Sequence, residues 1–119
     1  MNTRRSEFAA SQSEFTKVLQ LYIRLRFECR KEFPEIGNLP GAWDILLDMA
    51  LAQRLKQPFR IADAEGAAGS SPISVLKALK ALIEADMVTR EAHGGYASFR
   101  VRDVTLCRLE ELLTADYSH

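Results

Sequence analysis

The sequence SSPISVLKALKALIEADM, residues Ser70–Met87, decides the fold that we expect for this chain. Ser71 suits the N-cap position of a helix, and Pro72 suits the first helical position. Apolar residues then recur at helical spacing, at Val75, Leu76, Leu79, Leu82 and Ile83. At the far end Asp86 stands where many helices carry glycine, and aspartate tolerates the left-handed backbone better than most residues. The stretch therefore predicts an amphipathic helix over residues 71–85 with well-marked ends.

Two strands are expected directly after this helix, at Met87–His93 and Tyr96–Arg102. They flank Gly94-Gly95, a pair that suits the positive φ angles of a tight hairpin turn. A two-residue turn pairs Val88 with Val101, Arg90 with Phe99, and Thr89 with Arg100. This pairing predicts a β-hairpin with an apolar row on one face and a polar row on the other.

Two helices are expected before Ser70. Residues 42–55 follow a helical pattern with one apolar face. We expect the side chains of this face to be buried, and they are Trp43, Leu46, Leu47, Ala50 and Leu51. Asp44, Asp48, Gln53 and Arg54 are expected to face water. Pro58 ends this helix, and Phe59–Ile61 is long enough only for a short extended segment. Residues 62–68 then form a brief alanine-rich helix that Gly69 closes.

One further helix is expected at each end of the chain. Ser11 and Glu14 form a capping box ahead of an apolar stripe at Phe15, Val18, Leu19, Tyr22, Leu25, Cys29 and Phe33, which predicts a helix over residues 11–33. Asp103 caps a last helix over residues 103–116, with a buried stripe at Val104, Leu106, Leu109, Leu112 and Leu113. The first stripe exceeds what one compact domain readily covers, so we expect part of it to meet a second copy in a homodimer. The alternative is that it packs wholly against Trp43 and the last helix of its own chain.

The order of elements predicts a mainly α protein with a small β-hairpin, an α+β fold of the winged helix-turn-helix kind, in a single domain of 119 residues. Residues 42–102 form the winged part and residues 11–33 and 103–116 form the flanking helices. The sequences AWDILLD (residues 42–48), GSSP (residues 69–72) and VLKALKAL (residues 75–82) resemble those of MarR-like regulators, and the resemblance spans roughly residues 39–102. It implies a homodimer built from the first and last helices, a double-stranded DNA operator with two half-sites, regulation of transcription, and an unidentified small-molecule effector.

The residues themselves support duplex binding through the helix at 71–85. With its apolar face turned inward, this helix exposes short polar residues at its start and two lysines further along. Such residues suit a major groove or a phosphate. With two arginines of the hairpin, the candidate DNA contacts are Ser70, Ser71, Ile73, Ser74, Lys77, Lys80, Arg90 and Arg100. The hairpin tip departs from the family pattern. It consists only of His93-Gly94-Gly95-Tyr96, whereas MarR-like proteins carry a longer wing that reaches a minor groove.

Charge leaves a second interpretation open. The 16 Lys and Arg residues of the chain match its 16 Asp and Glu residues, so the formal net charge is zero. Between Ser70 and Arg102 five basic residues face three acidic ones, a modest excess for a phosphate-binding surface. The alternative is a winged-helix module that docks on another protein through the surface around Ile73 and Lys77.

Other function classes find little support in the sequence. His93 in a glycine turn and His119 at the last position offer no catalytic constellation and no metal site, so neither an enzyme nor a cofactor is expected. Cys29 and Cys107 stand far apart, which suits a reducing cytoplasm, although their places on the two flanking helices leave a redox switch open. No apolar stretch is long enough for a membrane span, and we expect a cytoplasmic protein.

Overall fold

The computed structural model describes residues 2–69 and 71–114, and this part of the chain is mainly helical with one antiparallel hairpin. In chain order the elements are α1 (Asn2–Glu32), α2 (Ala42–Arg54), α3 (Ile61–Ala68), α4 (Pro72–Glu84), β1 (Val88–His93), β2 (Tyr96–Val101) and α5 (Asp103–Thr114). The expected α+β class, helices with a small hairpin near the C-terminus, is thereby confirmed.

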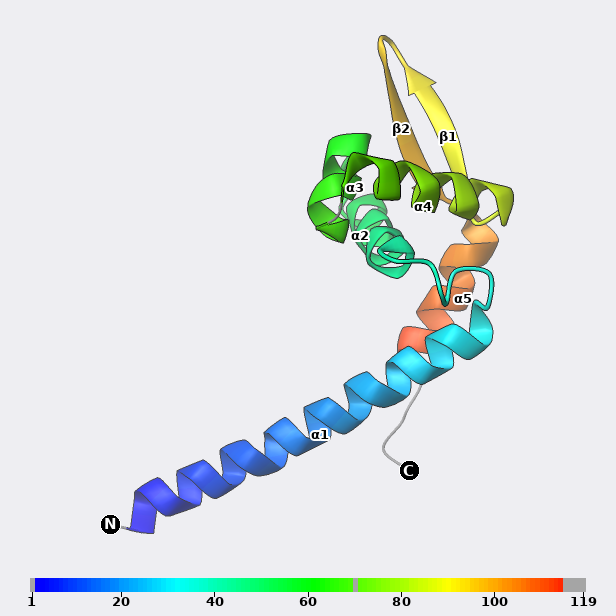
Figure 1. Cartoon of the computed structure of the whole chain (residues 1–119). Coiled ribbons are helices and arrows are strands. Elements are labelled where there is room, and N and C mark those ends of the chain that lie inside the picture. The colour runs from blue at the N-terminus through cyan, green and yellow to red at the C-terminus, as the bar shows by residue number, and fades with distance from the viewer. Residues whose placement is uncertain (1, 70, 115–119) are drawn as a thin grey trace.

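The molecule consists of a small globular body and a long projecting arm (Figure 1). The arm is α1, a single helix of 31 residues that touches the body only near its C-terminal end, where it meets α5. The protein therefore extends 62 Å in one direction but only 27 and 26 Å in the others. Pro34 explains where the arm ends, because a proline disfavours helical backbone in the residue before it.

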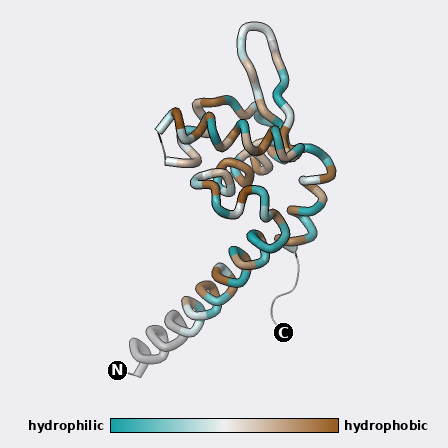
Figure 2. The backbone as a smooth tube through the Cα atoms, turned by 45° about the vertical axis from the view of Figure 1, so that its right-hand side comes forward, coloured by the Kyte–Doolittle hydropathy of each residue, from teal (hydrophilic) through white to brown (hydrophobic). Residues whose placement is uncertain are grey.

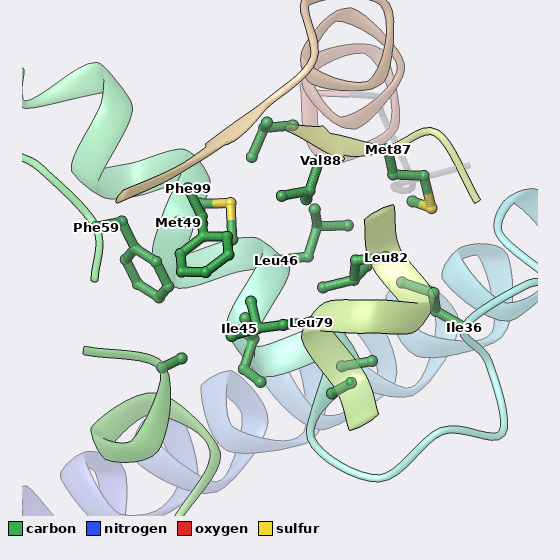
Figure 3. Close-up of a cluster of buried hydrophobic side chains, with 14 of the residues drawn as sticks. Ile36, Ile45, Leu46, Met49, Phe59, Leu79, Leu82, Met87, Val88 and Phe99 are labelled. Atoms are coloured by element: carbon green, nitrogen blue, oxygen red, sulfur yellow. The ribbon is translucent and has the colours of Figure 1, made fainter. Parts of the chain in front are cut away.

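The hydrophobic core lies between α2, α4 and the hairpin (Figure 3). Ile45, Leu46 and Met49 of α2 meet Leu79 and Leu82 of α4, and all five are almost fully buried. Each fully buried side chain of this size contributes about 1.5–3 kcal/mol through the area it removes from water. This packing fixes the orientation of α4 relative to the rest of the body.

The hairpin forms with the register that its sequence predicts. Val88 pairs with Val101, Thr89 with Arg100, and the turn falls at Gly94, whose φ is 63°. The extended segment expected at residues 59–61 is present only in part, since α3 begins at Ile61. Phe59 is buried, and its carbonyl accepts a hydrogen bond of 2.8 Å from the amide of Phe99, which ties the segment to β2.

Three helices end on a residue with left-handed backbone, as the sequence predicts for Gly69 (φ 59°) and Asp86 (φ 64°). The third, Lys56 (φ 58°), was not foreseen. After α2 the amides of Lys56 and Gln57 donate to the carbonyls of Gln53 and Ala52, the paired hydrogen bonds of a Schellman motif. These bonds stabilise a backbone that a lysine rarely adopts.

Two expectations for α2 were wrong. Leu51 was expected to face inward but is 55% exposed, whereas Ile45, which was not singled out, is fully buried. Gln53 was expected in water but is half-buried: its amide donates to the carbonyl of Val101 (3.3 Å), and its Oε1 accepts from the Val101 amide (3.0 Å). The apolar pattern of α2 does not predict the position of Gln53, because its partner is the backbone of Val101 in β2, which is distant in sequence. The buried amide and carbonyl of Val101 need hydrogen-bond partners, and Gln53 supplies both.

Other corrections concern exposure and boundaries. These side chains were expected in buried stripes but are exposed: Leu76, Ile83, Val104 and Leu113. The arm begins at Asn2 rather than residue 11, because residues 2–10 contain no glycine or proline that would stop a helix. Residues 115 and 116 of the expected last helix lie outside the described part of the chain.

We predict that Gln53→Ala lowers the free energy of unfolding by about 1–3 kcal/mol, because it leaves the amide and carbonyl of Val101 without partners at a half-buried site. Urea denaturation followed by circular dichroism measures the change. Gln57→Ala, an exposed glutamine just past the same helix, is the matched control and should change stability by less than about 0.5 kcal/mol. Equal stability of the two variants would show that the Gln53 contacts contribute nothing.

Candidate nucleic-acid interface

The exposed face of α4 carries most of the candidate contacts. Its inner face is buried at Val75, Ala78, Leu79 and Leu82. Ile73, Lys77 and Lys80 project from the opposite side, and Ile73 is 68% exposed. Three of the predicted contact residues are therefore brought together on one accessible helix face.

The start of α4 is capped by its own serines. The Ser71 hydroxyl accepts a hydrogen bond from the amide of Ser74 (3.3 Å) and donates one to the Ser74 hydroxyl (3.1 Å). The Ser74 amide is thus already satisfied and Pro72 has no N–H, so a phosphate bound by the first turn of α4 would depend on the amide of Ile73. Ser70, the first of the predicted contacts, lies outside the described residues.

The basic residues differ in how far acidic neighbours offset them. Lys80 lies 3.9 Å from Glu84, and Arg100 lies 3.7 Å from Asp103. Both pairs are largely exposed, where such contacts contribute little and leave the cation available. Lys77 and Arg90 form no ion pair with an acidic side chain of residues 13–69, 71–92 and 94–114. These two are the basic groups of the predicted site that lack an intramolecular partner in the described part.

The two hairpin arginines do not form one cluster. Arg90 stands opposite Phe99, and Arg100 stands opposite Thr89. Because side chains alternate between faces along a strand, these pairs lie on opposite faces of the hairpin. A single surface can therefore include both arginines only along an edge of the hairpin.

Arg60 is a basic residue near the hairpin that the sequence analysis missed. It precedes α3, and its guanidinium lies 4.1 Å from the centre of the Tyr96 ring at the hairpin tip. This cation–π contact holds an exposed arginine beside the hairpin and links two segments of the body. No local pattern could reveal it, because the partners are far apart in sequence.

The exposed side of α4 is also more apolar than expected. Leu76 is 52% exposed, and Ile83 follows it along the same side of the helix, next to Ile73 and Lys80. Together Ile73, Leu76 and Ile83 form a row that we call the α4 apolar row. The periodicity had placed Leu76 and Ile83 with the buried residues, since both are next to true core positions.

The two cysteines have different surroundings. Both are free; Cys29 is buried where α1 meets the body, and Cys107 is exposed on α5. Burial raises the pKa of the Cys29 thiol to about 11, against a smaller opposing effect of Arg26. A thiol with this pKa is a poor nucleophile at neutral pH, which disfavours Cys29 as an oxidant sensor. The cavity beside it, lined by Phe33 and Trp43 among others, has about 20 Å³, room for little more than a water molecule.

Among residues 13–69, 71–92 and 94–114, whose side chains the structure describes, no three His, Cys, Asp or Glu residues come together in a way that would hold a metal ion. Within the same ranges, no helix is both long and apolar enough to cross a membrane.

Comparison of the chain with protein-family models, with curated proteins and with solved structures found no match.

We predict that Cys29 reacts slowly with a thiol reagent in the native protein. In a Cys107→Ser variant, where Cys29 is the sole thiol, labelling at pH 8 should be about a hundredfold slower when folded than in urea, because the native thiolate fraction is that much smaller. The folded thiol binds its proton more tightly than the unfolded one. Its contribution to stability is therefore complete below about pH 8.5 and is lost as the pH rises towards 11. Equal labelling rates with and without urea would show that Cys29 is accessible and reactive.

Proposed function

We propose that this protein binds duplex DNA sequence-specifically, as a homodimeric transcriptional regulator of the winged helix-turn-helix kind. The observation that carries the proposal is the exposed face of α4, where Ile73, Lys77 and Lys80 project from a helix whose other side is fixed in the core. A rigidly mounted helix with short polar residues at its start and lysines along its face suits a major groove.

The order of elements around α4 supports this proposal. A short helix, a tight turn at Gly69 and a second, longer helix precede an antiparallel hairpin. In this interpretation α3 and α4 are the helix-turn-helix pair, α4 is the recognition helix, and the hairpin is the wing. The resemblance of residues 39–102 to MarR-like regulators favours the same assignment.

Each contact residue has a separate role in the proposal. Ile73 and Ser74, near the start of α4, read base edges, with Ser71 beside them. Lys77 and Lys80 contact phosphates and supply affinity without sequence preference. On the hairpin, Arg90 or Arg100 contacts the backbone from its own face, and Arg60 adds a phosphate contact beside the hairpin tip.

The homodimer in this proposal is supported by the arm. Large apolar side chains along residues 15–27 of α1 are exposed, among them Phe15, Val18 and Tyr22, so the stripe does not pack wholly within its own chain. A monomer seldom leaves such a continuous apolar surface in water. The small-molecule effector that the resemblance implies stays a prediction without an assigned site.

One observation favours a second candidate, a protein-interaction module. The α4 apolar row presents three exposed aliphatic side chains along one side of the helix, with Lys80 between Leu76 and Ile83, in a chain whose net charge is zero. Apolar side chains at i, i+3 and i+10 on an exposed helix suit a protein groove, whereas phosphates require cations. This candidate assigns the same face of α4 to a protein partner.

The deciding measurement is a fluorescence-anisotropy titration of the protein with a pool of short duplexes across a salt series. We expect Lys77→Glu to weaken binding to all duplexes about tenfold or more and to flatten the salt dependence, since a phosphate contact becomes a repulsion. Ile73→Ala and Ser74→Ala should instead change which sequences are preferred.

Lys77→Arg is the matched control, because it keeps the charge and should keep most of the affinity. If a folded protein bound no duplex even at low salt, or if all three substitutions left binding unchanged, α4 would not be a recognition helix. The protein-interaction module would then be the better account of its exposed face.

A further inference from the structure

The exposed part of α1 carries two apolar lines rather than one. The first line has the alternating spacing of three and four residues that is typical of a coiled-coil seam: Phe15, Val18, Tyr22, Leu25 and Cys29. The second line is Leu19, Ile23 and Phe27, and at 3.6 residues per turn it is displaced by about 120° around the helix. Ile23 is 65% and Phe27 62% exposed. One neighbouring helix cannot cover both lines, so α1 needs contacts on two sides.

The second line is bordered by positive charge. Lys17, Arg24 and Lys31 recur every seven residues, so they form a column along α1, about 100° around the helix from Leu19, Ile23 and Phe27. Arg24 and Lys31 stand three residues before and four residues after Phe27, which makes them its neighbours on the helix surface. All three basic residues are exposed. We call this side of α1, apolar line and basic column together, the arm face. A surface that covers it must offer apolar side chains beside acidic ones.

The body of the protein contains such a surface. An open groove of about 290 Å³ between α2 and α3 is lined by Asp44, Leu47, Asp48, Leu51 and Ala67. Leu51, the leucine that was expected in the core, is more than half exposed here, and the groove has no basic lining residue. We call this the α2 groove. Its acidic and apolar side chains complement those of the arm face.

We propose that the arm face of α1 in one copy of this chain docks in the α2 groove of a second copy, and reciprocally. The inference rests on the proposed homodimer and specifies how it forms. The seam of Phe15, Val18 and Tyr22 then packs on the same seam of the second copy, while Leu19, Ile23 and Phe27 cover Leu47 and Leu51. Both apolar lines of the arm are buried by one two-fold arrangement.

The distribution of charge identifies a second copy as the occupant. Helix α1 contains seven Lys and Arg residues against four Asp and Glu, whereas the remainder of the chain contains nine against twelve. The net charge of zero thus hides a positive arm and a negative body. The molecule is 62 Å long in its longest direction but only 27 and 26 Å wide in the other two. The arm therefore extends well past its own body (Figure 2).

The test uses two charge-reversed proteins without DNA, so the outcome is independent of duplex binding. Asp44→Lys/Asp48→Lys reverses the groove, and Lys17→Asp/Arg24→Asp reverses the arm face. We expect each variant alone to have a dimer dissociation constant raised about tenfold or more, since both contacts of its homodimer become repulsive. Analytical ultracentrifugation measures the constants.

The decisive step is to mix the two variants. Each contact of the mixed dimer then joins unlike charges, so the variants should form a heterodimer with an affinity within about threefold of the wild-type homodimer. Heterodimer formation also shows that both variants are folded. Should the double groove variant unfold, Asp48→Lys replaces it, because Asp48 lies beyond the first turn of α2 and does not interact with the helix dipole there.

Glu84→Lys is the matched control, an exposed acidic residue on α4 that is outside the groove and on neither flanking helix, and it should leave dimerisation unchanged. The inference is overturned if the groove variant dimerises as tightly as wild type or if the mixed variants do not associate. A wild-type monomer would overturn both this inference and the homodimer of the proposed function, whereas a wild-type dimer with an insensitive groove would overturn this inference only.

Discussion

The packing of α2 against α4 is the constraint on which the rest of the structure depends. Ile45, Leu46 and Met49 leave no freedom for α4, because interiors are packed as densely as organic crystals. The hairpin is fixed to the same core through Val88 and Val101, and Gln53 holds the second of these by both backbone groups. Whatever the exposed face of α4 contacts, it does so from a rigid support.

The same packing explains why the surface is unusually apolar in two places. A body this small has room for one core, so any helix longer than the body must leave part of its apolar surface outside. Helix α1 is such a helix, and within its residues 13–32 Cys29 is the one fully buried residue. On α4 the core accepts four positions of the helix, which leaves Leu76 and Ile83 to the solvent side. Both apolar surfaces are therefore places where a partner would be expected.

The sequence predicted those features that depend on neighbouring residues. The Ser71 cap, the left-handed Asp86 and the hairpin register are local, and each follows from the chemistry of a few adjacent positions. Features that depend on distant segments were missed, such as the hydrogen bonds of Gln53 to β2 and the contact of Arg60 with Tyr96. The candidate site was similarly divided: Ile73, Lys77 and Lys80 follow from helical periodicity, whereas the separation of Arg90 from Arg100 needed the pairing of the strands. Apolar residues next to core positions, such as Leu51 and Leu76, cannot be placed by periodicity alone, because the width of the buried stripe is set by the neighbouring elements.

Net charge is a poor guide to partners in this chain because its charges are segregated. A neutral protein does not attract DNA over long distances, because its positive and negative charges offset each other there. Salt at moderate concentration also screens each charge beyond about 10 Å. Within that distance the local arrangement of charges decides, and Lys77 and Arg90 form no ion pair with the acidic side chains that the structure describes. If α1 docks on a second copy, basic residues of the arm lie against Asp44 and Asp48, while Lys77 and Lys80 of α4 stay exposed in both copies. Dimerisation would then place two copies of α4 at a fixed distance, as an operator with two half-sites requires.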